Sequence, residues 1–195
     1  LPVGRLVIAT NENDILARTL ETGRYEMRGV KATTSPSMDI QISSNFERLL
    51  FEASGRDANY VCRCMASLKQ SGAFEIGEKT LANIRSAFSA GSADETEVAA
   101  EIGRTLRETG VLIDPHTAVA MAVARQHEHG ENPMVVLSTA HPAKFPDAVK
   151  SASGIDPALP SWLAHLMDKE EHFSVLSPDQ DELQAFIRAR LTTES

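Results

Sequence analysis

The stretch Arg5–Leu16, RLVIATNENDIL, decides the fold class of this chain. Its first half, Arg5 to Thr10, is a short aliphatic and β-branched run of the kind that forms a buried strand. Its second half carries Asn13 ahead of Asp14-Ile15-Leu16, which is typical of a capped helix start, and Gly23 is placed to end that helix. A strand that leads directly into a helix indicates an α/β protein.

The same alternation continues along the chain. Further short strands are expected at Val30–Thr33, Val111–Ile113, Met134–Ser138 and Phe173–Leu176. Helical stretches separate them, so the sequence predicts an α/β fold with a mostly parallel sheet covered by helices. Helices joined by a turn at Ser89–Ala93 would form a helical insert from about 56 to 109, and residues from about 152 to 195 would form a C-terminal extension.

The composition disfavours several classes of protein. With 195 residues, 42% of them hydrophobic, the chain is long enough to bury a sizeable core. Its net charge of -8 argues against a nucleic-acid partner, because affinity for phosphate backbones comes from clustered Lys and Arg. No apolar run approaches the roughly 20 residues that span a bilayer, so no membrane partner is expected.

The cysteines and histidines give no metal signature. One residue separates Cys62 from Cys64, which suits neither a disulfide nor a zinc knuckle and favours reduced thiols in a cytoplasmic protein. His127 and His129 would point to different faces of a helix. No metal site is therefore expected.

Polar residues follow three of the predicted strands, at Thr10–Asp14, Asp114–Thr117 and Thr139–Lys144. Each stretch precedes a helix start, whose free N–H groups and dipole favour an anionic ligand. Ligands of open α/β sheets bind beyond the carboxyl ends of the strands. These three stretches, which we call strand exits, are therefore candidates for lining one pocket. The alternative is that these residues only cap helices.

Four stretches resemble segments of bacterial and fungal threonine synthases. They are Ala9–Ile15, Ser35–Leu49, Asp114–Ala120 and Ser138–Pro146, in the family's order. The resemblance implies that residues 1–195 are the C-terminal part of a domain of a fold type II enzyme that uses pyridoxal 5'-phosphate (PLP). Such an enzyme converts O-phospho-L-homoserine and water into L-threonine and phosphate.

The resemblance also implies which residues meet the cofactor. The lysine that forms the Schiff base would lie upstream of Leu1, and none of the six lysines stands in a comparable motif, so no covalent catalyst is expected in this chain. Thr139 would face the pyridine nitrogen, with Asn11, Asn13 and Asp114 flanking the cofactor. His116 could act as an acid or base, since imidazole transfers protons near neutral pH, or could be only a hydrogen-bonded histidine.

The loop from Thr34 to Asn45 would be the substrate side. The hydroxyls, the amide and the cations there suit a leaving phosphate, and the predicted substrate residues are Ser35, Ser37, Asp39, Ser44, Asn45, Arg48 and Lys144. Asp39 would instead orient a donor or meet the substrate ammonium, because a carboxylate repels phosphate. Ser44 and Glu47 also have the spacing of a capping box and could do no more than start a helix.

Two other functions stay open at this point. One is a threonine synthase-like phospho-lyase that releases 2-oxobutyrate. The other is a non-catalytic domain that binds a phosphorylated metabolite or a partner chain. Since the chain begins with Leu1 and leads straight into an apolar run, we expect its main partner to be an N-terminal half of the same protein.

Overall fold

The computed structural model describes residues 3–127, 130 and 132–191. The chain divides into two compact units, Leu1–Ala158 and Leu159–Ser195. No helix in the described ranges is both long and apolar enough to cross a membrane.

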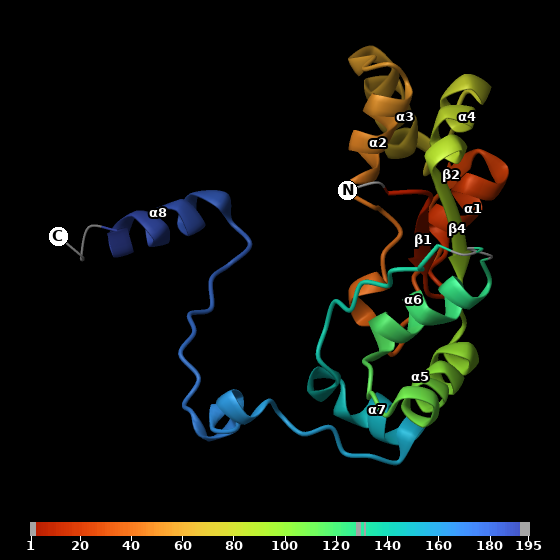
Figure 1. Cartoon of the computed structure of the whole chain (residues 1–195). Helices are drawn as coiled ribbons and strands as arrows, with labels where there is room; N and C mark the ends of the chain where they lie inside the picture. The colour runs from red at the N-terminus through yellow and green to blue at the C-terminus, as the bar shows by residue number, and fades with distance from the viewer. Residues whose placement is uncertain (1–2, 128–129, 131, 192–195) are drawn as a thin grey trace. The chain divides into compact units, whose positions relative to one another are not determined.

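The first unit is built around one parallel strand pair (Figure 1). Strand β1 (Leu6–Thr10) pairs with β4 (Phe88–Ser92) over its whole length, with Leu6 opposite Phe88 and Thr10 opposite Ser92. Helix α1 (Ile15–Thr22) follows β1 and ends at Gly23, whose φ of +80° suits a residue without a Cβ. The predicted strand and helix of the opening stretch are thus both present, and the α/β class is confirmed.

Helices pack at both ends of this strand pair (Figure 1). A short antiparallel pair, β2 (Arg24–Glu26) and β3 (Ala73–Glu75), lies with α2 (Phe46–Ala53), α3 (Ala58–Ser71) and α4 (Glu78–Ala87). Tyr25 is buried in the core of this part, stacked between Phe46 and Phe74 with ring centroids 5.1 and 5.0 Å away. Burial raises the pKa of the Tyr25 phenol.

The other end holds α5 (Glu95–Thr109), α6 (Pro115–Arg125) and α7 (Pro146–Ser153). Val98, Ile102, Val119 and Val123 form their core. The buried carboxylate of Glu101 accepts from Arg125 Nε at 2.8 and 3.0 Å, which ties α5 to α6 and raises the pKa of Arg125. Short 3-10 helices complete the unit: η1 (Pro36–Met38) and η2 (Pro142–Lys144).

The described part of the second unit, up to residue 191, contains three helical elements. They are η3 (Ser161–Leu163), η4 (Leu166–Asp168) and α8 (Gln180–Leu191). The predicted strand Phe173–Leu176 is wrong, since this run is not in strand conformation.

The structure corrects several other element predictions. The expected turn at Ser89–Ala93 is wrong, because this run lies in β4 and next to it, where β1 supplies a backbone partner. Val111–Ile113, Met134–Ser138 and Val30–Thr33 are not strands, since no strand in the described ranges pairs with them and a strand needs a neighbour's hydrogen bonds. The region 56–109 therefore holds β3 and β4 as well as helices.

Candidate functional site

The end of β1 leads into a buried network of polar side chains. Asn11 Nδ2 lies 2.8 Å from Thr33 Oγ1, 3.0 Å from Ser35 Oγ and 2.8 Å from Asp39 Oδ1. Asn13 Nδ2 donates to Asp39 Oδ1 at 2.9 Å. We call Asn11, Asn13, Thr33, Ser35 and Asp39 the asparagine–aspartate cluster; Asn11 and Ser35 are fully buried in it.

Asp39 is the hub of this cluster. Its Oδ1 accepts from Asn11, Asn13 and the Thr33 hydroxyl, the last at 2.7 Å, and its Oδ2 accepts from the Thr33 N–H at 2.9 Å. All of these donors are neutral groups of the chain itself. The carboxylate therefore fastens the loop to the end of β1.

Asn13 does not cap α1, contrary to the sequence prediction. Its Oδ1 accepts from Lys31 N at 2.9 Å, and its Nδ2 donates to Lys31 O at 2.9 Å. The residue before α1 is Asp14, which makes no side-chain cap bond. The backbone of Lys31 therefore occupies the amide oxygen of Asn13 that would accept a hydrogen bond in a helix cap. Local sequence around Asn13 does not indicate this contact.

A second cluster surrounds the start of α6. Asp114 is fully buried; its Oδ1 lies 2.9 Å from both His116 N and His116 Nδ1, and its Oδ2 accepts from the Thr117 hydroxyl. A carboxylate can only accept, so Nδ1 carries the imidazole proton and Nε2 is left with a lone pair. That lone pair accepts from Ser37 N at 3.3 Å. His116 thus bridges α6 and η1.

The third predicted strand exit joins the same cluster. Thr117 Oγ1 lies 3.2 Å from Ser138 Oγ, and the His116 ring packs against Phe145 with centroids 4.7 Å apart. Lys144 Nζ lies 5.9 Å from the centre of the Phe145 ring. The loop that contains η1 therefore connects the first two of the three predicted stretches, and Ser138 and Phe145, which flank the third, contact the second.

Other predicted site residues stand apart from these clusters. Ser44, Asn45 and Arg48 are exposed around the start of α2, and within the described ranges their side chains make no hydrogen bond or ion pair. The capping box at Ser44 is wrong: α2 begins at Phe46, and Asn45 is the residue before it. Thr139 is exposed, with no hydrogen bond from its hydroxyl in the part of the chain that the structure describes.

Sequence reasoning missed four residues that hold the site together. Thr33, Thr117 and Ser138 stand beside predicted residues, and a polar residue next to a strand exit was the available signal. Glu95 had no such signal. It accepts from Thr34 N at 3.1 Å and from Thr34 Oγ1 at 3.2 Å, across 61 positions of sequence.

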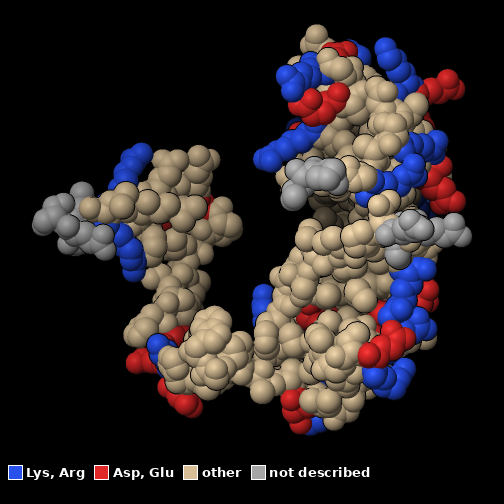
Figure 2. Space-filling model, viewed as in Figure 1, with Lys and Arg blue, Asp and Glu red and all other residues tan. Residues whose placement is uncertain are grey.

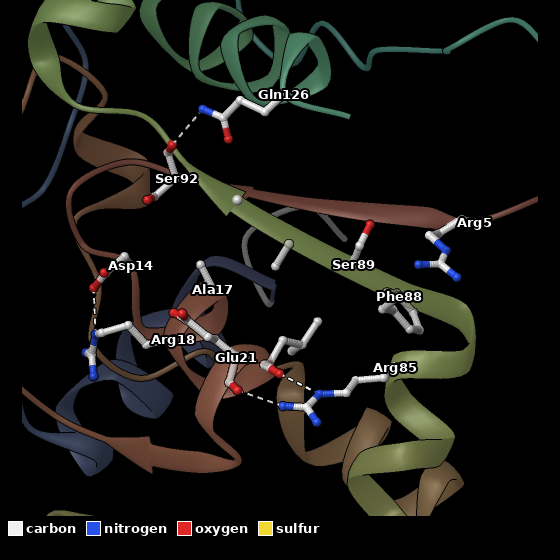
Figure 3. A pocket seen from close by; sticks show the side chains of 13 residues that line it. Arg5, Asp14, Ala17, Arg18, Glu21, Arg85, Phe88, Ser89, Ser92 and Gln126 are labelled. Atoms are coloured by element: carbon white, nitrogen blue, oxygen red, sulfur yellow. Dashed lines mark hydrogen bonds and ion pairs between the residues drawn. The ribbon is translucent and has the colours of Figure 1, made fainter. Parts of the chain in front are cut away.

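A separate groove of about 550 Å³ runs along β4 and α1 (Figure 3). Two of the three arginines that line it are engaged within the chain: Arg18 Nε pairs with Asp14 at 2.7 Å, and Arg85 donates to the carbonyls of Leu20 and Glu21 at 2.7 Å. Of the stretches predicted to line a pocket, only Thr10–Asp14 reaches it, through Asp14. Residues 3–127, 130 and 132–191 also contain no group of three His, Cys, Asp or Glu side chains placed to hold a metal.

Comparison with known proteins relates the chain to threonine synthases. Residues 117–187 match the family described as "Threonine synthase, C-terminal". Threonine synthase from Pseudomonas aeruginosa is 41% identical over 189 residues, which cover 96% of this chain and 40% of that protein. The corresponding enzyme from Methylobacillus glycogenes is 39% identical over 192 residues, with the same coverage.

Solved structures agree. A crystal structure of PLP-bound threonine synthase from Brucella melitensis is 59% identical, with a TM-score of 0.90, and covers 97% of this chain and 41% of that one. The yeast enzyme is 32% identical with a TM-score of 0.83 over 99% of this chain. The chain thus spans about two fifths of the length of these relatives. Over nearly its whole length the chain is therefore similar to a C-terminal portion of threonine synthases.

Proposed function

We propose that this chain is the C-terminal portion of a cytoplasmic threonine synthase, a PLP-dependent lyase that converts O-phospho-L-homoserine and water into L-threonine and phosphate. The observation that carries the proposal is identity of about 40% to threonine synthases over nearly the whole chain. All of residues 1–195 would then belong to one PLP enzyme domain, with 56–109 as an insert and 152–195 as an extension.

The residues present fit a PLP site at one position. The Thr139 hydroxyl is exposed and unengaged within the described ranges, so it is available to the pyridine nitrogen of the cofactor. A hydroxyl, unlike a carboxylate, does not stabilise a positive charge on that ring. Bound PLP supplies a sink for the electrons released at the carbons of the substrate amino acid.

The other three predicted cofactor residues are proposed to act indirectly. The amide nitrogens of Asn11 and Asn13 are held in the asparagine–aspartate cluster, and both oxygens of Asp114 are taken by His116 and Thr117. These side chains therefore position the wall of the site. Direct contact is left to Thr139.

His116 is also proposed as a positioning residue and not as an acid or base. Its ring is buried, Asp114 holds its proton on Nδ1, and Nε2 is occupied by the Ser37 N–H. A proton transfer by Nε2 would need that hydrogen bond to break. Its role is to hold η1, and with it the substrate loop, against α6.

The substrate phosphate is proposed to meet the start of α2 and the cations near it. Ser44, Asn45 and Arg48 are exposed there, and the first N–H groups of a helix favour an anion. Ser37 and Lys144 are likewise exposed and complete this set. Ser35 and Asp39 are proposed to stabilise the loop and not to contact the substrate, because their side-chain oxygens accept hydrogen bonds from Asn11 and Thr33.

No lysine of this chain is proposed as the covalent partner of PLP. That lysine would come from the N-terminal portion, so the 195-residue chain by itself should neither bind PLP covalently nor turn over. The two portions together would make the working enzyme.

The test is an assay of the full-length protein on O-phospho-L-homoserine, with threonine, phosphate and 2-oxobutyrate measured separately. We expect threonine and phosphate in equal amounts. Formation of 2-oxobutyrate alone would overturn the proposal in favour of a phospho-lyase, and no reaction despite bound PLP would favour a binding domain.

The role of Thr139 is tested in the same assay. Thr139→Val should lower kcat about tenfold, the effect of one lost hydrogen bond of ~1.4 kcal/mol, whereas Thr139→Ser should keep most activity. Thr96→Val, at an exposed threonine of α5, is the matched control. Equal kcat for Thr139→Val and the wild type would remove Thr139 from the site.

A further inference from the structure

Tyr25 keeps a hydroxyl group in an aromatic core. The residue is 2% exposed and its ring is stacked between Phe46 and Phe74, the second of which also lies opposite it across β2 and β3. A phenylalanine would fill the same space without burying an oxygen, which is unfavourable unless the oxygen has a hydrogen-bond partner. The partner of this hydroxyl therefore indicates what the tyrosine does.

The partner is the backbone of the loop on the substrate side. Ser43 N donates to Tyr25 Oη at 2.9 Å, across 18 positions of sequence. Burial raises the pKa of the phenol, so its oxygen is a neutral acceptor. Ser43 O in turn accepts from Phe46 N at 3.0 Å, which closes a turn from Ser43 to Phe46.

Tyr25 contacts both ends of this turn. Its oxygen holds the Ser43 N–H, and its ring stacks on Phe46 with centroids 5.1 Å apart and 22° between the ring planes. Phe46 is the first residue of α2, so the stacking also fixes where that helix begins. The two residues between these ends, Ser44 and Asn45, are exposed. One buried side chain thus sets the position of an exposed polar pair and of the first N–H groups of α2.

The position of these groups matters because charge alone does not favour an anion here. Over the end of the first unit that holds α2, α3 and α4, Figure 2 shows acidic and basic side chains interspersed. Glu47 and Arg48, of opposite charge, are both exposed at the start of α2. Binding of a phosphate would then depend on well-aimed neutral donors, and a hydrogen bond weakens steeply when its geometry is lost.

We propose that Tyr25 is a positioning residue for the substrate phosphate: it fixes the turn so that Ser44, Asn45 and the start of α2 are aimed at the phosphate. This assignment rests on the proposed function, in which those groups meet the phosphate. Tyr25 itself is buried and does not touch the substrate. A loosened turn would bind the ground state and the transition state less well by the same amount, which raises KM and leaves kcat unchanged.

The experiment compares Tyr25→Phe with Tyr60→Phe in the full-length protein. Each change removes a phenol oxygen that accepts from a backbone N–H, at 2.9 Å from Ser43 N and at 3.0 Å from Gly77 N. Gly77 lies directly before α4, so the control loses the same kind of bond at the start of another helix.

Tyr25→Phe should raise the KM for O-phospho-L-homoserine about fivefold, the effect of one hydrogen bond of ~1 kcal/mol, with kcat within about twofold of the wild type. Tyr60→Phe should change neither. An unchanged KM in Tyr25→Phe would overturn the proposal. Equal rises of KM in both variants would also overturn it, because general loss of stability would then be the cause.

Two measurements do not depend on turnover. Amide exchange at Ser43 should be about fivefold faster in Tyr25→Phe, and exchange at the wild-type rate would overturn the proposal. If the full-length protein makes no threonine, the variants are titrated with inorganic phosphate by calorimetry. Phosphate binding about fivefold weaker in Tyr25→Phe alone would count only against the proposed function. Equal affinity in wild type and Tyr25→Phe, or no binding to the wild type, would overturn the positioning role.

Discussion

Replacing the hub of the asparagine–aspartate cluster, Asp39→Asn, should loosen the loop that carries η1. The substitution keeps the size of the side chain and one oxygen that can accept from Asn11, Asn13 and the Thr33 hydroxyl. It removes the charge. It also places an amide NH₂ against the Thr33 N–H, which in the wild type donates to Asp39 Oδ2. A donor would then face a donor.

The size of the effect follows from these four hydrogen bonds. A hydrogen bond to a charged acceptor contributes about 1.5–3 kcal/mol and a neutral one about 0.5–1.5, so each of the three retained bonds weakens by about 1 kcal/mol. The unsatisfied Thr33 N–H costs about 1–3 kcal/mol more. Together these losses amount to about 4–6 kcal/mol. Because Asp39 is only half-buried and water can replace part of the lost bonding, we expect the free energy of opening the loop to fall by about 2–4 kcal/mol.

The assay is amide exchange of Thr33 and Lys31, whose N–H groups are held by Asp39 and Asn13. An opening cost lowered by 2–4 kcal/mol corresponds to exchange about 30- to 1,000-fold faster. Ser37→Ala is the control, because its hydroxyl makes no hydrogen bond in the described ranges and its N–H is kept. Exchange of Thr33 within about threefold of the wild type would refute the role of Asp39 as the hub.

Three further perturbations test the packing and electrostatics of the first unit. Glu101→Gln should destabilise the protein by about 2–3 kcal/mol in urea denaturation, because it breaks a buried ion pair whose partner Arg125 is partly exposed. The pKa of the Tyr25 phenol is raised in the folded state, so the folded protein keeps the phenol proton above about pH 10, where the unfolded chain loses it. The contribution of Tyr25 to stability should therefore be complete below that pH and fall as the pH rises through the folded pKa. Urea denaturation at about pH 9 and about pH 11 measures this difference. Gly91→Ala should cost about 1–3 kcal/mol in thermal unfolding, since a Cβ there would stand 2.9 Å from a methyl group of buried Val123.

Each of these has a matched control. Glu108→Gln removes the exposed carboxylate bound to Arg125 and should cost about 0.5 kcal/mol or less; equal costs for both glutamates would contradict a buried pair. Tyr25→Phe should remove the additional loss at high pH, and an unchanged loss would assign it to other groups. Gly4→Ala meets nothing within 4 Å, so a cost as large as that of Gly91→Ala would exclude steric contact as the cause.

The candidate site could be predicted in outline but not in its roles. Polar residues after apolar runs pointed to segments whose side chains form the two polar clusters of the structure, because strand ends and helix starts carry local signatures. The sequence did not show which polar atoms are free to bind a ligand. Asp114 was expected to flank the cofactor, and Asp39 to orient a donor or meet the substrate ammonium; the oxygens of both accept from Thr33, Asn11, His116 and other groups of the chain. Among the predicted residues, Thr139, Ser37, Lys144 and those around the start of α2 are exposed, and their side chains make no hydrogen bond or ion pair within the described ranges.

The sequence by itself determined the α/β class, the strand and helix of residues 5–23, and the resemblance to threonine synthases, because those depend on local hydrophobic pattern and on the order of short segments. Tertiary structure decided the rest. Phe88–Ser92, rich in small residues, has the local signals of a turn and is a strand only because β1 lies beside it, some 80 residues earlier. Met134–Ser138 has the local signals of a strand and is not one, since no partner is paired with it in the described ranges. A strand forms only when a second segment supplies the hydrogen-bonding partners of its backbone, and the sequence of one segment does not show whether that partner is present.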